Sequence, residues 1–359
     1  MVFMCLLLAF SISGQFELKK PVLGLGTAGE HLIVFQEDAV EKWNADGEQV
    51  GKKKLPEYDQ VYRWKDGFFL TNFRKYEIHW YDPADDDTVI TKSLGKGFSF
   101  TLDPKKAMQI ALEQSNFKPY FESETLFIFA KRKRCLAFLP GLVPVDSFDL
   151  PLKPRFLAYH RGKTFAVTDS NALLILDRKG EILDSLRLKN YVESLKAEGG
   201  YLFLSSVDSL IVLREDDLSR VRAFGLKGMK SVSCNGDLIF LKCVSVMGKE
   251  SDKLICLDGK FETLWERETD RVPLIPVLNN GEKLYLGNGK WLLGIDPSSG
   301  AVVDSLYLPL GKRKLSLAEK MMSKISPIPI SDEVYIDGIA EFKGFLWVYG
   351  HKKLFRLKK

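Results

Sequence analysis

A short motif recurs along this chain at a nearly constant spacing, and this spacing constrains the fold more than any other feature. The clearest copy is the segment 173–186 (LLILDRKGEILDSL), and its nearest match is the segment 291–306 (WLLGIDPSSGAVVDSL). Each copy contains a short apolar strand, a polar turn that starts at Asp177 or Asp296, and a second strand. A fixed period of this kind indicates a repeat architecture.

Six weaker copies of the motif complete the series. In these copies the places of Asp177 and Asp296 are taken by Asn44, Asp82, Pro140, Arg214, Asp258 and Lys358. Successive positions from Asn44 to Lys358 differ by 38, 58, 37, 37, 44, 38 and 62 residues. Most of these intervals lie close to one value, and the two long ones indicate insertions, at about 95–118 and 309–332, in a tandem array.

Each unit also contains an earlier strand, usually after a glycine turn. Examples are the segments 68–70 (FFL), 126–129 (LFIF) and 202–204 (LFL). Four short antiparallel strands in about 40 residues is the spacing of a β-propeller blade. We therefore predict an all-β chain that forms a single β-propeller of eight four-stranded blades over residues 16–359.

The two ends of the chain predict how the last blade is completed. The last unit stops at Lys359, directly after its third strand. The segment 16–21 (FELKKP) resembles the segment 148–154 (FDLPLKP), which is a fourth strand that leads into the next blade. We expect the residues around Phe16 to supply the missing strand, which removes an exposed sheet edge.

The first fifteen residues differ in composition from the rest. Met1 to Phe10 is an apolar run, and small or polar residues follow from Ser11 to Gln15. This pattern predicts a signal peptide over residues 1–15 and a periplasmic or secreted protein, with a buried first strand as the alternative. No later segment approaches eighteen consecutive apolar residues, so we expect no transmembrane span.

The repeated pattern Leu-Asp-x-x-Gly-x-x-x-x-x-Leu resembles the repeats of PQQ-like and NHL-like propellers over most of residues 16–359. Quinoprotein-type repeats carry a docking tryptophan late in the unit. Here Asp304 holds that place, and only Trp265 comes near it, so we expect no quinone and no other cofactor. The related outer-membrane assembly propellers bind other proteins without a cofactor, and the resemblance alone selects no function.

Both insertions contain a predicted short helix. Asp103 before Pro104 is a strong helix start, and 316–319 (SLAE) is a capping box. Each insertion connects the fourth strand of one blade to the first strand of the next, so both helices are expected on the face that also carries the turns between second and third strands. We call it the helix-bearing face. It is a candidate binding surface. The alternative is that apolar helix residues plug that end of the channel: Ile110, Leu112, Leu317 and Met321.

Basic clusters at 131–134 (KRKR) and 312–314 (KRK) are expected on the same face. If they are exposed together they favour an anionic ligand, and otherwise they are solvated turns. The formal net charge of +5 is too small to indicate a nucleic-acid partner.

Catalytic signals are weak. The four histidines have no metal-like spacing, and we expect no bound metal. Polar residues near innermost strands are the candidate ligand-binding residues: Arg63, Tyr120, Arg155, Tyr159, His160, Glu193 and Asp337. For each of them, the alternative is a salt bridge or hydrogen bond between neighbouring blades.

Four cysteines follow the predicted signal peptide, and none forms a CxxC pair. Cys243 and Cys256 can face each other across a hairpin and oxidise in an exported protein. Otherwise they are small buried hydrophobic residues.

The hypothesis that fits these observations best is a monomeric, non-enzymatic binding scaffold for a protein or glycan on the helix-bearing face. The alternative is a hydrolase of the metal-assisted lactonase or esterase type with its active site at the channel mouth. Asn279, Asn280, Glu193 and Asp337 are its first candidate residues.

Overall fold

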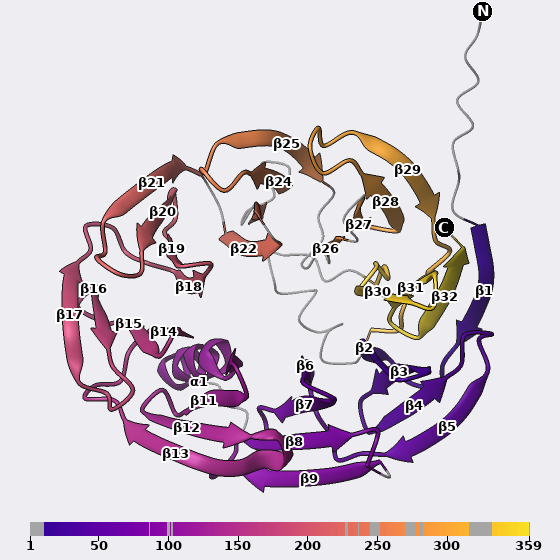
Figure 1. The fold of residues 1–359 in the computed structure, drawn as a ribbon, viewed down its shortest axis with the longest axis horizontal. Coiled ribbons are helices and arrows are strands. Elements are labelled where there is room, and N and C mark those ends of the chain that lie inside the picture. Colours follow the sequence, from indigo (N-terminus) through magenta and orange to yellow (C-terminus); the bar gives the residue numbers. More distant parts are fainter. Residues whose placement is uncertain are drawn as a thin grey trace, which may run out of the picture. The chain divides into compact units, whose positions relative to one another are not determined.

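The computed structural model describes residues 11–85, 87–98, 101, 103–226, 229–235, 237–244, 252–269, 277–279, 283–315 and 332–358. These residues form eight four-stranded antiparallel sheets, and the chain is an eight-bladed β-propeller, as the repeat predicts (Figure 1). The chain divides into two compact units, residues 1–54 with 235–359 and residues 55–234.

Within a blade, strands that follow one another in the sequence pair side by side as an antiparallel meander. Blades 1 to 4 contain, in turn, β2 (Val22–Ala28), β3 (His31–Gln36), β4 (Ala39–Trp43) and β5 (Gln49–Lys54); β6 (Gln60–Trp64), β7 (Gly67–Asn72), β8 (Glu77–Asp82) and β9 (Thr88–Ser93); β10 (Pro119–Glu122), β11 (Thr125–Ala130), β12 (Arg134–Leu139) and β13 (Val143–Asp149); β14 (Phe156–His160), β15 (Lys163–Val167), β16 (Ala172–Leu176) and β17 (Ile182–Arg187).

Blades 5 to 8 follow the same order along the chain, except that blade 8 takes one strand from the N-terminal segment. They contain, in turn, β18 (Ser194–Glu198), β19 (Tyr201–Ser205), β20 (Ser209–Arg214) and β21 (Arg220–Gly225); β22 (Met229–Asn235), β23 (Leu238–Val244), β24 (Asp252–Leu257) and β25 (Thr263–Thr269); β26 (Val277–Asn279), β27 (Leu284–Asn288), β28 (Trp291–Ile295) and β29 (Val302–Tyr307); β30 (Gly338–Phe342), β31 (Phe345–Gly350), β32 (Lys353–Lys358) and β1 (Ser11–Glu17).

The predicted completion of the last blade is confirmed, because β1 pairs antiparallel with β32. Phe16 lies opposite Leu354 in this register. Its ring packs against Trp43 of blade 1 and Trp347 of blade 8, with ring centroids 5.0 and 6.0 Å apart. The strand therefore joins blade 8 to blade 1 through an aromatic contact as well as through backbone hydrogen bonds.

The recurring Asp or Asn has a local cause. Asp177 Oδ1 accepts hydrogen bonds from the backbone N–H groups of Lys179 and Glu181, both at 2.8 Å. Asp258 and Asn44 make the same pair of bonds in their own turns. Short polar side chains satisfy turn donors in this way, so the repeat records the turn between third and fourth strands.

The glycine of this turn makes room for the preceding blade. Gly180 and Gly300 have φ angles of +81° and +70°, which other residues rarely adopt. A Cβ atom on Gly300 would lie 2.6 Å from the indole of Trp265, whose Nε1 donates a hydrogen bond to the carbonyl oxygen of Pro297 at 2.9 Å. Trp265 is therefore a docking residue between blades 6 and 7, where the sequence had shown only an approximate match.

The first insertion contains the predicted helix, α1 (Pro104–Asn116), which follows β9. Asp103 is its N-cap, and the Asp103 carboxylate accepts from the N–H groups of Lys105 and Lys106. A short 3-10 turn, η1 (Pro140–Leu142), precedes β13. The second predicted helix lies outside the described residues. None of the helices in the described part of the chain has the length and apolarity needed to cross a bilayer.

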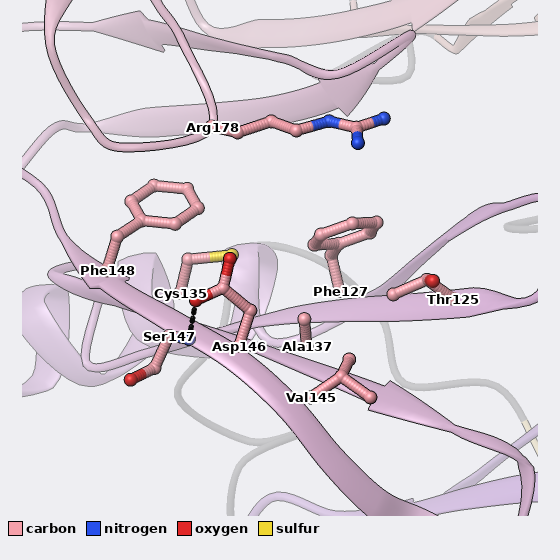
Figure 2. Close-up of a pocket in the computed structure, with 9 residues that line it drawn as sticks. All are labelled: Thr125, Phe127, Cys135, Ala137, Val145, Asp146, Ser147, Phe148 and Arg178. Atoms are coloured by element: carbon pink, nitrogen blue, oxygen red, sulfur yellow. Dashed lines mark hydrogen bonds between the residues drawn. The ribbon is translucent and has the colours of Figure 1, made fainter.

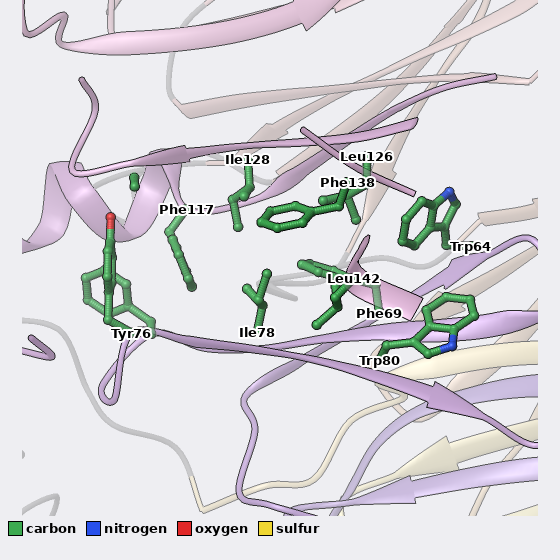
Figure 3. Close-up of a cluster of buried hydrophobic side chains, with 12 residues drawn as sticks. Trp64, Phe69, Tyr76, Ile78, Trp80, Phe117, Leu126, Ile128, Phe138 and Leu142 are labelled. Atoms are coloured by element: carbon green, nitrogen blue, oxygen red, sulfur yellow. The ribbon is translucent and has the colours of Figure 1, made fainter. Parts of the chain in front are cut away.

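A hydrophobic cluster of blades 2 and 3 lies beneath α1 (Figure 3). Phe117, the C-cap residue of α1, stacks on Tyr76 with a centroid distance of 4.7 Å. Ile110 of the helix packs against the same cluster. The end of the helix is thus fixed to the core of the propeller.

The cysteines do not form the disulfide that the hairpin allows. Cys243 pairs in register with Lys253, while Cys256 pairs with Phe240, so the two thiols do not face each other. Both are buried, and neither is in a disulfide. Burial raises the pKa of the Cys256 thiol to about 12, which keeps it protonated and unreactive at neutral pH.

We predict that Phe16→Ala lowers the free energy of unfolding by about 2–4 kcal/mol, because it removes the aromatic contact with Trp43 and Trp347. Ile12→Ala is the matched control, since Ile12 lies on the same strand with 40% of its surface exposed. It should change stability by less than about 0.5 kcal/mol. Urea unfolding measures both, and equal losses would contradict the role given to Phe16.

Candidate functional site

The C-terminal end of α1 is attached to blade 4 by the side-chain amide of Asn116, which forms hydrogen bonds with backbone groups at the start of β14. Asn116 Nδ2 donates to the carbonyl oxygen of Arg155 at 2.9 Å, and Asn116 Oδ1 accepts from the N–H of Leu157 at 2.8 Å. Asn116 has 2% of its surface exposed. Both hydrogen bonds are therefore shielded from water, and they fix the helix relative to β14.

A buried ion pair attaches the same helix to blade 3. Glu113 Oε1 lies 3.3 Å from Arg132 Nε and 2.9 Å from Lys153 Nζ. Glu113 and Arg132 each have 5% of their surface exposed. Arg132 also donates to the carbonyl oxygen of Pro154 at 2.8 Å. A buried pair needs such additional hydrogen bonds to offset its loss of solvation.

This ion pair bears on the first helix and on the basic cluster 131–134. Arg132 lies in the turn between β11 and β12, so the first insertion does share a face with a turn between second and third strands. The basic cluster 131–134 is not uniformly exposed, however, because Arg132 is buried in its ion pair with Glu113. Lys131, Lys133 and Arg134 remain exposed.

The other side of α1 is open to solvent. Lys105, Lys106 and Gln109 are exposed, and Met108 has 60% of its surface exposed. Met108 therefore adds apolar surface among charged side chains on the outer side of the helix. Ile110, by contrast, packs against the hydrophobic cluster of blades 2 and 3.

The surface around α1 is cationic. We define it as segments 103–118, 130–135 and 150–155, which contain only two carboxylates, Asp103 and Glu113. Asp103 is used as the helix cap, and Glu113 is paired with Arg132 and Lys153. Lys105, Lys106, Lys131 and Lys133 are exposed on this surface, and Lys153 has half of its side chain exposed. We call this the α1 surface.

Three of the predicted ligand-binding residues, Tyr120, Tyr159 and Arg155, form hydrogen bonds between neighbouring blades. Tyr120 donates to the carbonyl oxygen of Leu157 at 2.7 Å, and Tyr159 donates to Glu122 Oε2 at 3.0 Å. These contacts join blades 3 and 4, and the two tyrosine rings lie with centroids 6.5 Å apart. Burial raises the pKa of both phenols, so neither is a base at neutral pH.

Arg155 joins blades 4 and 5 in a similar way. Its guanidinium donates to the carbonyl oxygen of Val192 at 3.0 Å and to Asn171 Oδ1 at 3.2 Å. The guanidinium also lies 3.9 Å from the ring centroid of Tyr191, in cation–π geometry. Its contacts favour the structural interpretation of this residue.

His160 and Glu193 lie apart from the α1 surface. His160 Nδ1 lies 2.6 Å from Glu215 Oε1 in the turn between β20 and β21. Glu193 is half-buried just before β18, and its backbone N–H donates to the carbonyl oxygen of Ser205. Each residue therefore contributes to the joint between blades 4 and 5 or to the start of blade 5.

Arg63 and Asp337 occupy different compact units of the chain. Arg63 is exposed on β6, with its guanidinium 4.8 Å from the ring centroid of Phe68. Asp337 precedes β30, and its carboxylate accepts from the N–H of His351 at 2.8 Å. Crowding by the surrounding protein raises the pKa of the Asp337 carboxyl although its side chain reaches solvent.

Residues of the alternative hydrolase hypothesis are only partly described. Asn279 lies on β26, and Asn280 lies outside the described residues. In the described part of the chain, no three His, Cys, Asp or Glu side chains are grouped so that they can hold a metal ion.

The sequence interpretation missed Glu113 and Asn116, the two residues that fix α1. A signal was present, because residues three apart on a helix share a face, and Ile110 lies on that same face. A glutamate and an asparagine on the same helix face as a buried apolar residue indicate side chains that form hydrogen bonds or ion pairs with the blades rather than with solvent.

We predict that Glu113→Ala lowers the free energy of unfolding by about 3–5 kcal/mol, because it leaves the buried Arg132 guanidinium without its carboxylate. Gln114→Ala is the matched control, since Gln114 is the next residue on the same helix and is exposed. It should cost less than about 0.5 kcal/mol. Chemical denaturation tests both, and a Glu113→Ala loss no larger than that of the control would show that the pair does not hold the helix.

Neither protein-family models nor curated proteins match this sequence. Solved structures do match. BamB from Moraxella catarrhalis has a TM-score of 0.60 at 10% identity, over 98% of this chain and 100% of that one. The computationally designed protein Ika8 has a TM-score of 0.62 at 8% identity, over 96% and 98%. Hsv2 from Kluyvelomyces marxianus has a TM-score of 0.50 at 11% identity, over 77% and 93%. At such low identities the likeness to BamB and Ika8 concerns the fold alone.

Proposed function

We propose that this chain is an exported, non-enzymatic binding scaffold that holds a protein with an acidic surface on the α1 surface. One observation carries the proposal. The helix is fixed on its inner side by Glu113 and Asn116, while its outer side presents lysines around an exposed Met108. A rigid element with an unburied apolar centre and a charged rim has the composition of a protein interface.

The charge of the α1 surface selects the class of partner. Glu113 is neutralised within the buried ion pair, and Asp103 at the helix cap is the one exposed carboxylate. The exposed lysines of the α1 surface therefore outnumber its exposed carboxylates. An acidic protein is attracted to such a surface over about one Debye length, which is about 10 Å at 0.1 M salt. Met108 then supplies apolar contact area, which favours a protein over a glycan.

We also propose a relation to PQQ-like or NHL-like propellers. The capped turn at Asp177 and Asp258 and the docking of Trp265 on the next blade support this relation. The fold likeness to BamB is consistent with it.

Site-specific photocrosslinking tests the binding surface. A photoreactive phenylalanine analogue at position 108, introduced in the source cells, should give one protein adduct. The same analogue at Ile182, which is 53% exposed on β17, should not give that adduct. Lys105→Glu with Lys106→Glu should reduce the adduct yield at position 108 by about tenfold, because two attractive charges become repulsive.

A charge-matched control separates local from global electrostatics. Lys179→Glu with Arg220→Glu changes the net charge by the same amount as the Lys105 and Lys106 pair. Both positions are exposed, and they lie at or beside turns between third and fourth strands, at the opposite end of the blade. This pair should leave the yield within about twofold. An equal loss in both double variants, or no adduct at position 108, would reject the α1 surface, and an adduct digested by glycosidases would assign it to a glycan instead.

Export is the second part of the proposal. The apolar run Met1–Phe10 supports a signal peptide within residues 1–15. The structure adds a constraint, because β1 begins at Ser11 and pairs with β32 up to Glu17. Removal of all fifteen residues would leave only Phe16 and Glu17 of this strand.

The mature N-terminus is therefore informative. We expect the intact mass of protein purified from its source to lack an N-terminal segment that includes Met1–Phe10 and ends no later than Gln15. Loss of Phe16 would remove the aromatic contact with Trp43 and Trp347. Retention of Met1–Phe10 in the mature protein would contradict export by this segment.

A further inference from the structure

A pocket of about 160 Å³ lies between the outer strands of blade 3 and the turn between third and fourth strands of blade 4 (Figure 2). Its lining is mixed: Phe127, Ala137 and Phe148 supply apolar surface, and Thr125, Asp146 and Ser147 supply polar groups. Arg178 lies across its mouth. A cavity of roughly 150 Å³ in a protein interior admits benzene, so this volume suits a single small ring system.

The pocket occupies the place that a tryptophan fills elsewhere in the same molecule. Asp146 pairs with Ala137 beside a bulge at Val145 in β13, and Trp265 pairs with Cys256 beside the corresponding bulge at Leu264 in β25. Asp146 and Trp265 are therefore equivalent positions on the fourth strands of blades 3 and 6. An aspartate stands in blade 3 where an indole stands in blade 6.

The receiving blades correspond as well. Trp265 donates its indole N–H to the carbonyl oxygen of Pro297, the residue after the turn aspartate of blade 7. Arg178 is the residue after the turn aspartate of blade 4, and it lines the pocket. Phe148, two residues beyond Asp146, contacts Gly180 with its ring edge. Because residue 146 is an aspartate, no aromatic side chain from that position fills the space beside Phe148, which we call the slot.

Arg178 is held in position over this slot. Its guanidinium lies 3.2 Å from Glu122 Oε2, and Glu122 also accepts from Tyr159. A Cβ atom on Gly162 would lie 2.9 Å from Arg178 Nε, so the guanidinium rests against a backbone that only glycine leaves open. With 65% of its side chain exposed, Arg178 presents further donors to solvent.

The charges of the pocket are separated. Asp146 lies beside Cys135 on the side away from Arg178, as Figure 2 shows, and its carboxylate accepts from the N–H of Ser147. Burial raises the pKa of the Cys135 thiol, so this sulfur acts as an apolar surface and not as a nucleophile. The end of the pocket under Arg178 is thus the end away from the Asp146 carboxylate.

We propose that this pocket binds a small planar aromatic carboxylate of about indole size. The ring fills the slot that Trp265 fills between blades 6 and 7, and the carboxylate accepts hydrogen bonds from Arg178. Guanidinium groups pair with carboxylates through two parallel N–H donors, and a fixed guanidinium loses less entropy in doing so. This site is distinct from the α1 surface and does not depend on the proposed scaffold function.

Calorimetric titration with indole-3-acetate tests the site on the full chain. We expect one molecule to bind per chain. Arg178→Leu should weaken this binding by about tenfold or more, because a charge-assisted hydrogen bond is lost, whereas uncharged indole should be affected by less than about threefold. Arg178 is largely exposed, so this variant should fold normally.

Asp146→Trp tests the equivalence with blade 6. The new indole should fill the slot and abolish binding of indole-3-acetate. Asp184→Trp is the matched control, since Asp184 pairs with Ile175 directly before the same bulge in the next blade. It should bind like the parent protein.

Three results would overturn the proposal. They are no binding of indole-3-acetate up to millimolar concentration, binding of tryptamine as tight as that of indole-3-acetate, and unchanged affinity in a folded Asp146→Trp variant. Circular dichroism establishes folding of each variant before titration.

Discussion

The pairing of β1 with β32 is the interaction on which the last blade depends. It satisfies the backbone groups of an outer strand that would otherwise be an open edge, and it places Phe16 between Trp43 and Trp347. Similar aromatic contacts recur at other junctions, from Phe148 to Gly180 and from Trp265 to Gly300. At these three junctions a large aromatic ring packs against the glycine of a turn.

The sequence predicted the parts of the fold that short-range chemistry decides. Turn residues such as Asp177 and Gly180 are visible because they solve the same local problem in every blade. The N-cap at Asp103 predicted α1 for the same reason. Contacts between blades could not be predicted from the sequence. They depend on which side chains of two separate sheets the strand registers bring together.

The candidate site shows this limit most clearly. The sequence predicts Tyr120, Arg155 and Tyr159 as ligand-binding residues near innermost strands. The structure shows them joining blades by hydrogen bonds. Glu113 and Asn116 matter for the α1 surface because Arg132 and β14 lie opposite them. Nothing in a single sequence pairs a helix residue with a turn or a strand at that distance.

The partnership of β1 and β32 has a consequence for how the protein reaches its native state. More than three hundred residues separate Phe16 from Leu354, and contacts of such long range form late, because the entropy of closing the intervening chain must first be offset. Until then β32 lacks its outer neighbour and exposes an unpaired edge to other chains. Synthesis must therefore reach Lys358, the last residue of β32, before β1 can find its complete partner.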